Sequence, residues 1–327
     1  MDTAAPSETP HRMTPVHGGS TDAALLDLLD YLEKAGYRFI TPTPATHARV
    51  IARPDRQRAR SLEDVLGWNL PFAPGTIDDD AVSLLLRAGM IEGKELLRSV
   101  LRVSWLRDRL FLHSAFPTTA EDSVFFGPDS YRFAELVAKE LERSECPAGG
   151  CIVDIGTGAG VGAIVAADIC PGARIVMTDI NPKALALARI NCGAAGVTAE
   201  ALQGRNLASV SGAVDVAMAN PPYITDAAHR LYRDGGGMHG AEISMEMARA
   251  AVERLAPEGR FILYTGSAII DGHDFVRASL EQIAASNNCQ LRYWEIDPDV
   301  FGEELENMFY ADVDRIAAVA AILTRRA

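Results

Sequence analysis

The chain has 327 residues, of which 48% are hydrophobic and 23% charged, so it is long enough for two globular domains with a substantial core. Its formal net charge of −13 disfavours a long polyanionic partner, because proteins that bind along nucleic acids use basic surfaces. The five cysteines form no CxxC pair, which argues against a metal site or a disulfide framework and favours buried, reduced thiols.

The first segment, residues 1–20, is polar and lacks the apolar centre of an export signal, so we interpret it as a disordered tail. No apolar run in the chain approaches the roughly 20 residues that a membrane span requires. Together with the expected reduced thiols, these features predict a cytoplasmic protein without a membrane partner.

Residues 21–116 show the patterns of a small α+β domain. Leucines recur at helical spacing from Leu25 to Leu32, and Ser61 with Asp64 forms a capping-box pattern at the start of a second helix. The expected elements are helices over residues 21–39, 61–68 and 78–91, followed by a β-hairpin over residues 100–114. Three helices and a hairpin are typical of a winged-helix-like fold, and we interpret the region as an accessory domain for substrate recognition.

The remaining residues, 117–327, are expected to form a second domain. From Cys151 onward, short apolar strands alternate with amphipathic helices, which requires a parallel sheet with helices on both faces. The last two strands, QLRYWEI and RIAAVAAILTRR, have no clear helix between them and are expected to pair antiparallel. The sequence therefore predicts an α/β fold with a Rossmann-like sheet.

A glycine loop follows the first strand of this sheet and opens a helix. It reads Asp154-Ile-Gly156-Thr-Gly158-Ala-Gly160, and Asp179 ends the next strand 19 residues later. Glycines let the backbone turn sharply and approach a ligand closely, and an acid at that distance suits two ribose hydroxyls. Both NAD and S-adenosylmethionine fit this pattern. The acid before the glycines favours S-adenosylmethionine, since Asp154 can orient the loop or meet the positive end of a methionyl group.

A second motif, Asn220-Pro221-Pro222-Tyr223, lies at the carboxyl end of a later strand, where ligands bind in open α/β sheets. The motif suits methylation of a planar nitrogen. The lone pair of such a nitrogen is delocalised, so two acceptors must hold its N–H bonds and stabilise the positive charge that develops. The Asn220 oxygen and the Pro221 carbonyl can be these acceptors, and Tyr223 can stack on the flat acceptor group. Asn220, Pro221 and Tyr223 are thus the candidate catalytic residues.

These motifs resemble those of the class I methyltransferases with an NPPY-type motif, especially the release-factor and ribosomal-protein glutamine N5-methyltransferases. The resemblance covers about residues 123–325 and rests on VDIGTGAG, TDINPKALALARIN, NPPY, FFGPDS and DGGGMHG. It implies that the sheet has seven strands and that Asn220 and Tyr223 hold the acceptor nitrogen. The N-terminal region does not match the five-helix substrate domain of the release-factor enzymes.

On the cofactor side, the resemblance implies a pocket for S-adenosylmethionine, with S-adenosylhomocysteine as the product. Asn206 stands where the family more often has an acid that reaches the adenine amino group, and an amide oxygen can serve the same purpose. The candidate cofactor-binding residues are Asp154, Gly156, Thr157, Gly158, Gly160, Asp179, Ile180, Asn206 and Asn220.

Three acceptor classes share this chemistry. The leading hypothesis is a glutamine-type amide of a protein, and the first alternative is a small-molecule guanidine or amine of a biosynthetic pathway, which the acidic charge supports. The second alternative is a base of RNA or DNA, which the net charge disfavours. One basic cluster, residues 47–60 with five arginines, could contact phosphate, although a solvated surface is favoured there. A cofactor-binding module without turnover is the non-enzymatic hypothesis.

Overall fold

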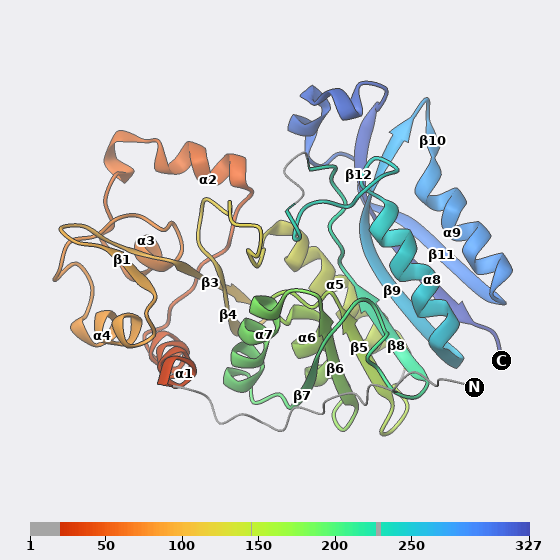
Figure 1. Cartoon of the computed structure of the whole chain (residues 1–327), viewed down its shortest axis with the longest axis horizontal. Helices are drawn as coiled ribbons and strands as arrows, with labels where there is room; N and C mark the ends of the chain where they lie inside the picture. The colour runs from red at the N-terminus through yellow and green to blue at the C-terminus, as the bar shows by residue number, and fades with distance from the viewer. Residues whose placement is uncertain (1–19, 145, 227–229) are drawn as a thin grey trace, which may run out of the picture.

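The computed structural model describes residues 20–144, 146–226 and 230–327, and it is built around one large sheet with helices on both faces (Figure 1). The strand order is β7-β6-β5-β8-β9-β12-β11, and the short strand β10 pairs with β9 off this path. The strands are β5 (Cys151–Ile155), β6 (Arg174–Asp179), β7 (Ala199–Gln203), β8 (Val214–Ala219), β9 (Leu255–Ile270), β10 (His273–Asp274), β11 (Cys289–Asp297) and β12 (Arg315–Arg325). The predicted α/β sheet of seven strands is confirmed, and β10 adds a two-residue eighth.

The direction of the strands places the site. The strands β5, β6, β7, β8 and β9 run parallel to one another. Strand β12 is antiparallel to both β9 and β11, as the sequence predicts for the last pair. From β5 the chain proceeds outward to β6 and β7, and then returns to β8 on the other side of β5. At such a reversal the loops after adjacent strands diverge and leave a crevice at the carboxyl ends of the strands.

Helices cover the two faces of the sheet separately. The helices α5 (Pro128–Arg143), α6 (Val161–Ile169) and α7 (Pro182–Ala194) lie on one face, and α8 (Glu242–Arg254) and α9 (Phe275–Ser286) lie on the other. Successive side chains of a strand point to opposite faces. Along β5, Ile152 accordingly packs in the core of the first face and Val153 in the core of the second.

The N-terminal region is a smaller α+β unit beside the sheet (Figure 1). Its elements are α1 (Ser20–Lys34), α2 (Pro44–Ile51), the 3₁₀ turn η1 (Pro54–Arg56), α3 (Leu62–Leu66), α4 (Asp79–Arg87), the strand pair β1 (Ile91–Gly93) and β2 (Leu97–Ser99), and the hairpin β3 (Leu101–Leu106) and β4 (Arg109–Ser114). The three predicted helices and the hairpin are confirmed. Within the described residues the region has one more helix, α2, and one more strand pair than the sequence predicts. Ser20 belongs to α1 rather than to the expected tail, and residues 1–19 lie outside the described residues.

One buried side chain connects this region to the sheet. Asn191 of α7 is fully buried, and its Oδ1 accepts a hydrogen bond from Leu112 N of β4 at 2.9 Å. Its Nδ2 donates to the carbonyl oxygens of Leu112 at 3.0 Å and of Ala159 in the glycine loop at 2.9 Å. Apolar residues of α1 and β4 pack in the same core as those of α5, α6 and α7. The hydrophobic core is therefore continuous between the N-terminal region and the sheet.

The expectation of five reduced thiols is wrong for two cysteines. Cys146 and Cys170 form a disulfide, whereas Cys151, Cys192 and Cys289 are free and buried. The pair was not predictable by spacing, because the two cysteines are 24 positions apart in sequence and the intervening strand and helix bring them together in space. Among the described residues no helix is long and apolar enough to cross a membrane, and no group of side chains has the composition of a metal site.

Candidate active site

A cavity of about 580 Å³ opens at the carboxyl ends of β5, β6 and β8. This volume is within the range of roughly 300–1,000 Å³ that small-molecule sites occupy. Its walls come from the glycine loop after β5, the NPPY turn after β8, the N-terminal end of α5 and the segment 297–303. Helix α2 closes a further side through Thr43, Pro44, Ala45 and Arg49. The reversal point of the sheet thus holds one cavity that segments far apart in sequence enclose.

The glycine loop has the backbone conformation that its sequence demands. Gly156, Gly158 and Gly160 have φ values of +65°, +54° and +85°, a region that other residues rarely adopt. Gly156 and Gly158 line the cavity, as does Thr157 between them. Gly160 does not line it. A Cβ at that position would lie 3.3 Å from the Cβ of Ala188, so this glycine allows α6 and α7 to pack closely.

The buried side chain of Asp154 holds this loop through hydrogen bonds. The side chain is 1% exposed, and its Oδ2 accepts hydrogen bonds from Thr157 Oγ1 at 2.7 Å and from Ala163 N at 3.0 Å. Burial raises the pKa of Asp154 to about 7, although these two hydrogen bonds act in the opposite direction. Of the two roles that the sequence leaves open, the contacts favour orientation of the loop. The carboxyl group also borders the cavity.

Asp179 lies opposite the glycines, at the end of β6. Its Oδ2 accepts from Gly158 N at 3.0 Å and its Oδ1 accepts from Asn181 N at 2.8 Å, so both oxygens have fixed positions. Ile180 follows and lines the cavity with an exposed apolar side chain. Asn206 also lines the cavity, and its Nδ2 donates to Glu246 Oε1 at 3.0 Å. That contact uses the donor of the amide and leaves its oxygen as the acceptor.

The NPPY turn follows β8, and each of its four residues lines the cavity. Tyr223 is 6% exposed, and its ring makes edge contacts with Tyr264 and Phe301 at centroid distances of 6.3 and 5.7 Å. A Cβ at Gly266 on β9 would lie 2.2 Å from Cδ2 of this ring. Burial, together with the nearby charge of Asp129, raises the pKa of Tyr223 well above its usual range, so the phenol is neutral.

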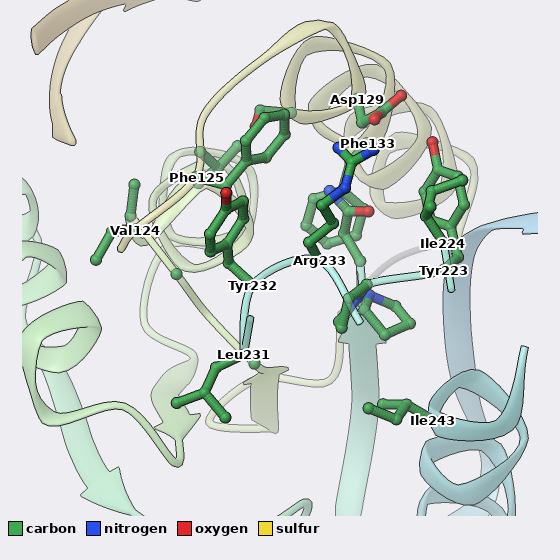
Figure 2. A pocket seen from close by; sticks show the side chains of 18 of the residues that line it. Val124, Phe125, Asp129, Phe133, Tyr223, Ile224, Leu231, Tyr232, Arg233 and Ile243 are labelled. Atoms are coloured by element: carbon green, nitrogen blue, oxygen red, sulfur yellow. The ribbon is translucent and has the colours of Figure 1, made fainter. Parts of the chain in front are cut away.

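Asp129 is a buried acid near the NPPY turn that the sequence does not single out (Figure 2). It stands in the first turn of α5, where Tyr264 Oη donates to its Oδ1 at 2.8 Å. Arg132 lies 3.4 Å from the same oxygen and 2.8 Å from Asp297 Oδ2. Burial is the largest effect on Asp129 and raises its pKa. The FFGPDS segment, which the family resemblance includes, was the available signal for this position.

The outer part of the cavity is aromatic. Phe125 and Tyr232 stack with a centroid distance of 6.2 Å and an interplanar angle of 9°, and Figure 2 shows them beside Arg233 and Leu231. Tyr232 is held by its hydroxyl, which donates to the Thr118 carbonyl at 2.6 Å. Tyr232 lies in a loop without a recognisable motif, whereas Phe125 is the first residue of the FFGPDS segment, which sequence reasoning did not assign to the site.

Charged side chains of several segments lie in or near the cavity. Within the 47–60 cluster, Arg49 reaches the cavity and Arg56 forms a salt bridge with Asp64 at 3.0 Å. After the NPPY turn, Glu246 lines the cavity, whereas Asp226 is buried and paired with Arg230 at 2.6 Å. The acidic side of the cavity comes instead from Asp297, Asp299 and Glu303.

The sequence is similar to those of known methyltransferases. The profile of the methyltransferase small domain family matches residues 124–288, which is half of the chain. The release factor glutamine methyltransferase of Deinococcus radiodurans is 28% identical over 181 residues, which cover 54% of this chain and 63% of that protein. The Moorella thermoacetica enzyme of the same name is 36% identical over 146 residues, covering 40% and 51%. The ribosomal protein L11 methyltransferase of Geobacter metallireducens is 41% identical over 101 residues, covering 31% and 32%. The chain thus spans less than two thirds of the length of these curated relatives.

Proposed function

Because the chain belongs to the methyltransferase small domain family, we propose that it transfers a methyl group from S-adenosylmethionine to a planar nitrogen, and that this nitrogen is a glutamine-type amide of a protein. One observation carries the proposal. The glycine loop, Asp179 and the Asn220-Pro221 turn, which have separate positions in the sequence, line a single cavity. Binding of a nucleoside and presentation of an NH₂ group can therefore occur side by side.

The residues on the inner side of the cavity fit S-adenosylmethionine. Gly156 and Gly158 leave space where side chains would intrude, and the two oxygens of Asp179 keep lone pairs for the ribose hydroxyls. Ile180 offers an apolar surface to the adenine ring, and the Asn206 oxygen can accept from the adenine amino group. When bound, S-adenosylmethionine supplies an electrophilic methyl group on a sulfonium and leaves as S-adenosylhomocysteine.

The NPPY turn would hold the acceptor. The Asn220 side-chain oxygen and the Pro221 carbonyl would accept hydrogen bonds from the two N–H groups of the NH₂ group. These two hydrogen bonds would direct the nitrogen lone pair toward the methyl donor. The prolines fix the backbone, so these acceptors are oriented before the acceptor arrives. No strong base is required, because the donor group is cationic and the nitrogen acidifies as it is methylated.

Two features bear on the acceptor class. The names of the similar proteins support a protein glutamine, and the stacked Phe125–Tyr232 pair in the cavity lining offers an apolar surface to the aliphatic part of a glutamine side chain. A second candidate is a small cationic amine or guanidine. It is supported by Asp299 and Glu303, two acids of the cavity lining, whereas Asp297 is paired with Arg132.

Transfer of a radioactive methyl group separates these candidates. The protein would be incubated with tritiated S-adenosylmethionine and, in parallel, with cell protein, total RNA and a pool of small amines and guanidines. We expect label in protein, which acid hydrolysis should release as methylamine from N5-methylglutamine. Label only in the small-molecule fraction would favour the second candidate, and label in protease-resistant RNA would contradict both.

The variant Asn220→Ala tests the assigned chemistry. It removes one of the two acceptors, so we expect methyl transfer to fall by about 10² to 10³-fold, the cost of losing one aligned charge-stabilising group. The Kd for S-adenosylhomocysteine, measured by calorimetry, should change only several-fold. The matched control is Asn287→Ala, which removes a helix-capping amide outside the cavity and should leave transfer unchanged. Full activity of Asn220→Ala would refute the proposed role.

A further inference from the structure

A second cavity of about 510 Å³ lies away from the candidate active site. It is formed where the C-terminal end of α5 meets the strands β9, β11 and β12. Its charged side chains are five arginines and two glutamates: Arg143, Arg260, Arg292, Arg325, Arg326, Glu140 and Glu258. This cavity is therefore a positively charged site in a chain whose net charge is −13.

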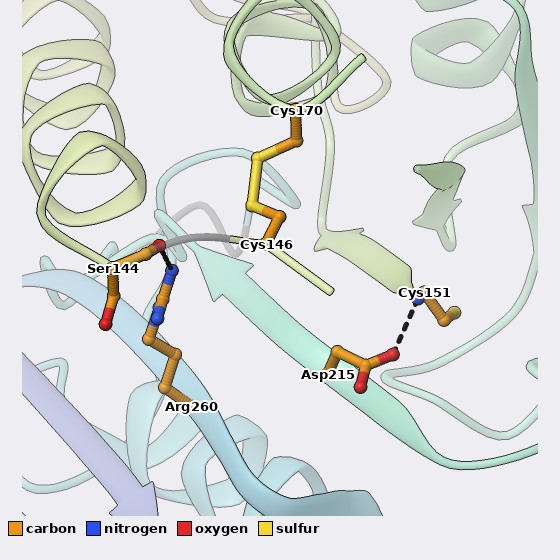
Figure 3. The surroundings of a disulfide bond; sticks show 6 residues. All are labelled: Ser144, Cys146, Cys151, Cys170, Asp215 and Arg260. Atoms are coloured by element: carbon orange, nitrogen blue, oxygen red, sulfur yellow. Dashed lines mark hydrogen bonds between the residues drawn. A yellow bond between two sulfur atoms is a disulfide. The ribbon is translucent and has the colours of Figure 1, made fainter. Parts of the chain in front are cut away.

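Arg260 is the buried member of the group. It is 9% exposed, its Nη2 donates to the Ser144 carbonyl at 2.7 Å, and its Nε has no hydrogen-bond partner within the described part of the chain. Figure 3 shows this bond beside the Cys146–Cys170 disulfide, which ties the segment after α5 to the end of α6. A buried guanidinium destabilises the folded protein unless it is compensated, and the acid that acts on Arg260, Glu140, is shared with Arg292. An anion that enters the cavity would remove that cost.

Of the neighbouring arginines, one has an ion-pair partner within the described residues and the others have none there. Arg292 pairs with Glu140, and Arg325 Nη1 donates to the Leu255 carbonyl at 2.8 Å. For the described residues, no ion pair is formed by Arg143 or Arg326. The five arginines outnumber the two glutamates of the lining, so the balance of charge is positive. Several guanidinium groups therefore line one cavity, and the N–H donors of Arg143 and Arg326 form no ion pair within the described residues.

We propose that this second cavity binds the phosphoryl group of a small molecule. Guanidinium groups match the oxygens of a phosphate with paired hydrogen bonds, and an assembly of several planar forks suits three or four such oxygens better than one carboxylate. A small phosphate ester fits better than a nucleic acid. The key arginine is recessed in a cavity, and the overall negative charge repels a long polyanion.

The phosphoryl site is distinct from the methyl-transfer cavity. Arg260 lies near the amino end of the part of β9 that pairs with β8, whereas Gly266 on the same strand contacts Tyr223 of the NPPY turn. Six residues of extended chain separate the two by roughly 20 Å. A ligand at each site can therefore bind without contact between the two.

Calorimetric titration with inorganic phosphate tests the proposal. The protein would be saturated with S-adenosylhomocysteine to fill the first cavity, and ionic strength would be held constant with sodium chloride. We expect saturable binding of phosphate and of ribose 5-phosphate. The double variant Arg143→Gln/Arg326→Gln should weaken both by at least ten-fold, and Arg260→Gln should abolish them.

The control is Arg277→Gln, which removes an exposed arginine of α9 and the same type of charge far from this cavity, so binding should be unchanged. If Arg260→Gln does not fold, the double variant of the two exposed arginines decides. Binding that does not saturate, or that the double variant retains in full, would overturn the proposal. Tighter binding of an RNA oligonucleotide than of ribose 5-phosphate would also overturn it, in favour of a polyanion.

Discussion

At the scale of single residues, position 266 shows how packing limits the site. Gly266→Ala would place a Cβ 2.2 Å from Cδ2 of Tyr223, closer than two carbon atoms can approach, so the ring must move. We expect methyl transfer to fall at least ten-fold and the free energy of unfolding to fall by about 1–3 kcal/mol, the usual cost of overpacking. Transfer assays and urea unfolding would measure the two effects.

A second glycine provides the control for this substitution. Gly302 has an ordinary φ and no atom within 4 Å of where its Cβ would be. Gly302→Ala should therefore fold and transfer methyl groups as the unaltered chain does. Equal activity of the two alanine variants would show that the position of the Tyr223 ring does not matter for transfer.

Asp154 gives a prediction about pH. Burial raises its pKa from 3.8 to about 7 in the folded state, so between these values the folded chain binds one proton more than the unfolded chain. The contribution of Asp154 to stability is therefore complete below about pH 4 and is lost as the pH rises through 7. Relative to Asp154→Asn, the free energy of unfolding should fall by at most about 4 kcal/mol over this range.

Urea unfolding of both chains at intervals between pH 4 and pH 8 measures this difference. Comparison with the asparagine variant cancels the titration of other groups, because asparagine keeps an oxygen for Thr157 and Ala163 and does not titrate. A difference that stays flat, or that rises with pH, would mean that Asp154 is ionised in the folded protein.

At the scale of elements, the sequence predicts those parts whose signals are local. Cap residues and apolar spacing locate α3 and α4, since Ser61 and Asp78 each accept a hydrogen bond from a backbone N–H at the start of the helix. The local pattern does not locate β7, although the expected seven-stranded sheet includes it, because β7 lies at the sheet edge and has no fully buried residue. Helix α9 was also missed, although its cap at Asp274 and its buried Val276 and Leu280 follow the ordinary pattern.

The candidate site divides in the same way. The glycine loop, Asp179 and the NPPY turn each have a fixed spacing within one strand and its following loop, so the sequence could place them. Tyr232 and Arg49 enter the cavity because distant segments pack together, and a single sequence carries no signal for such contacts. Phe125 belongs to the FFGPDS segment, so the resemblance signals its segment but not its contact with Tyr232. The candidate cofactor-binding residues are therefore easier to predict than the residues proposed to contact the acceptor.

At the scale of the whole molecule, the decisive contact is that between the N-terminal region and the sheet. The side chain of Asn191 satisfies both backbone groups of Leu112 and the carbonyl of Ala159, and all of these are buried. If the N-terminal region separated alone, these groups would lose their partners, at roughly 1–3 kcal/mol each. It would also expose the core that α1 and β4 share with α7.

We therefore predict that the protein unfolds in one transition. No intermediate should be populated in which the sheet is folded and the N-terminal region is unfolded. The tryptophans make this measurable, because Trp68 and Trp105 lie in that region and Trp294 lies in β11. The variant Trp294→Phe reports on the first region by fluorescence, and Trp68→Phe/Trp105→Phe reports on the sheet. Urea midpoints that agree with each other and with the circular dichroism of each variant are expected. An earlier midpoint for the first region would mean that α2, with Arg49, can leave the cavity while the sheet stays folded, so that opening of this wall could admit an acceptor as large as a protein segment.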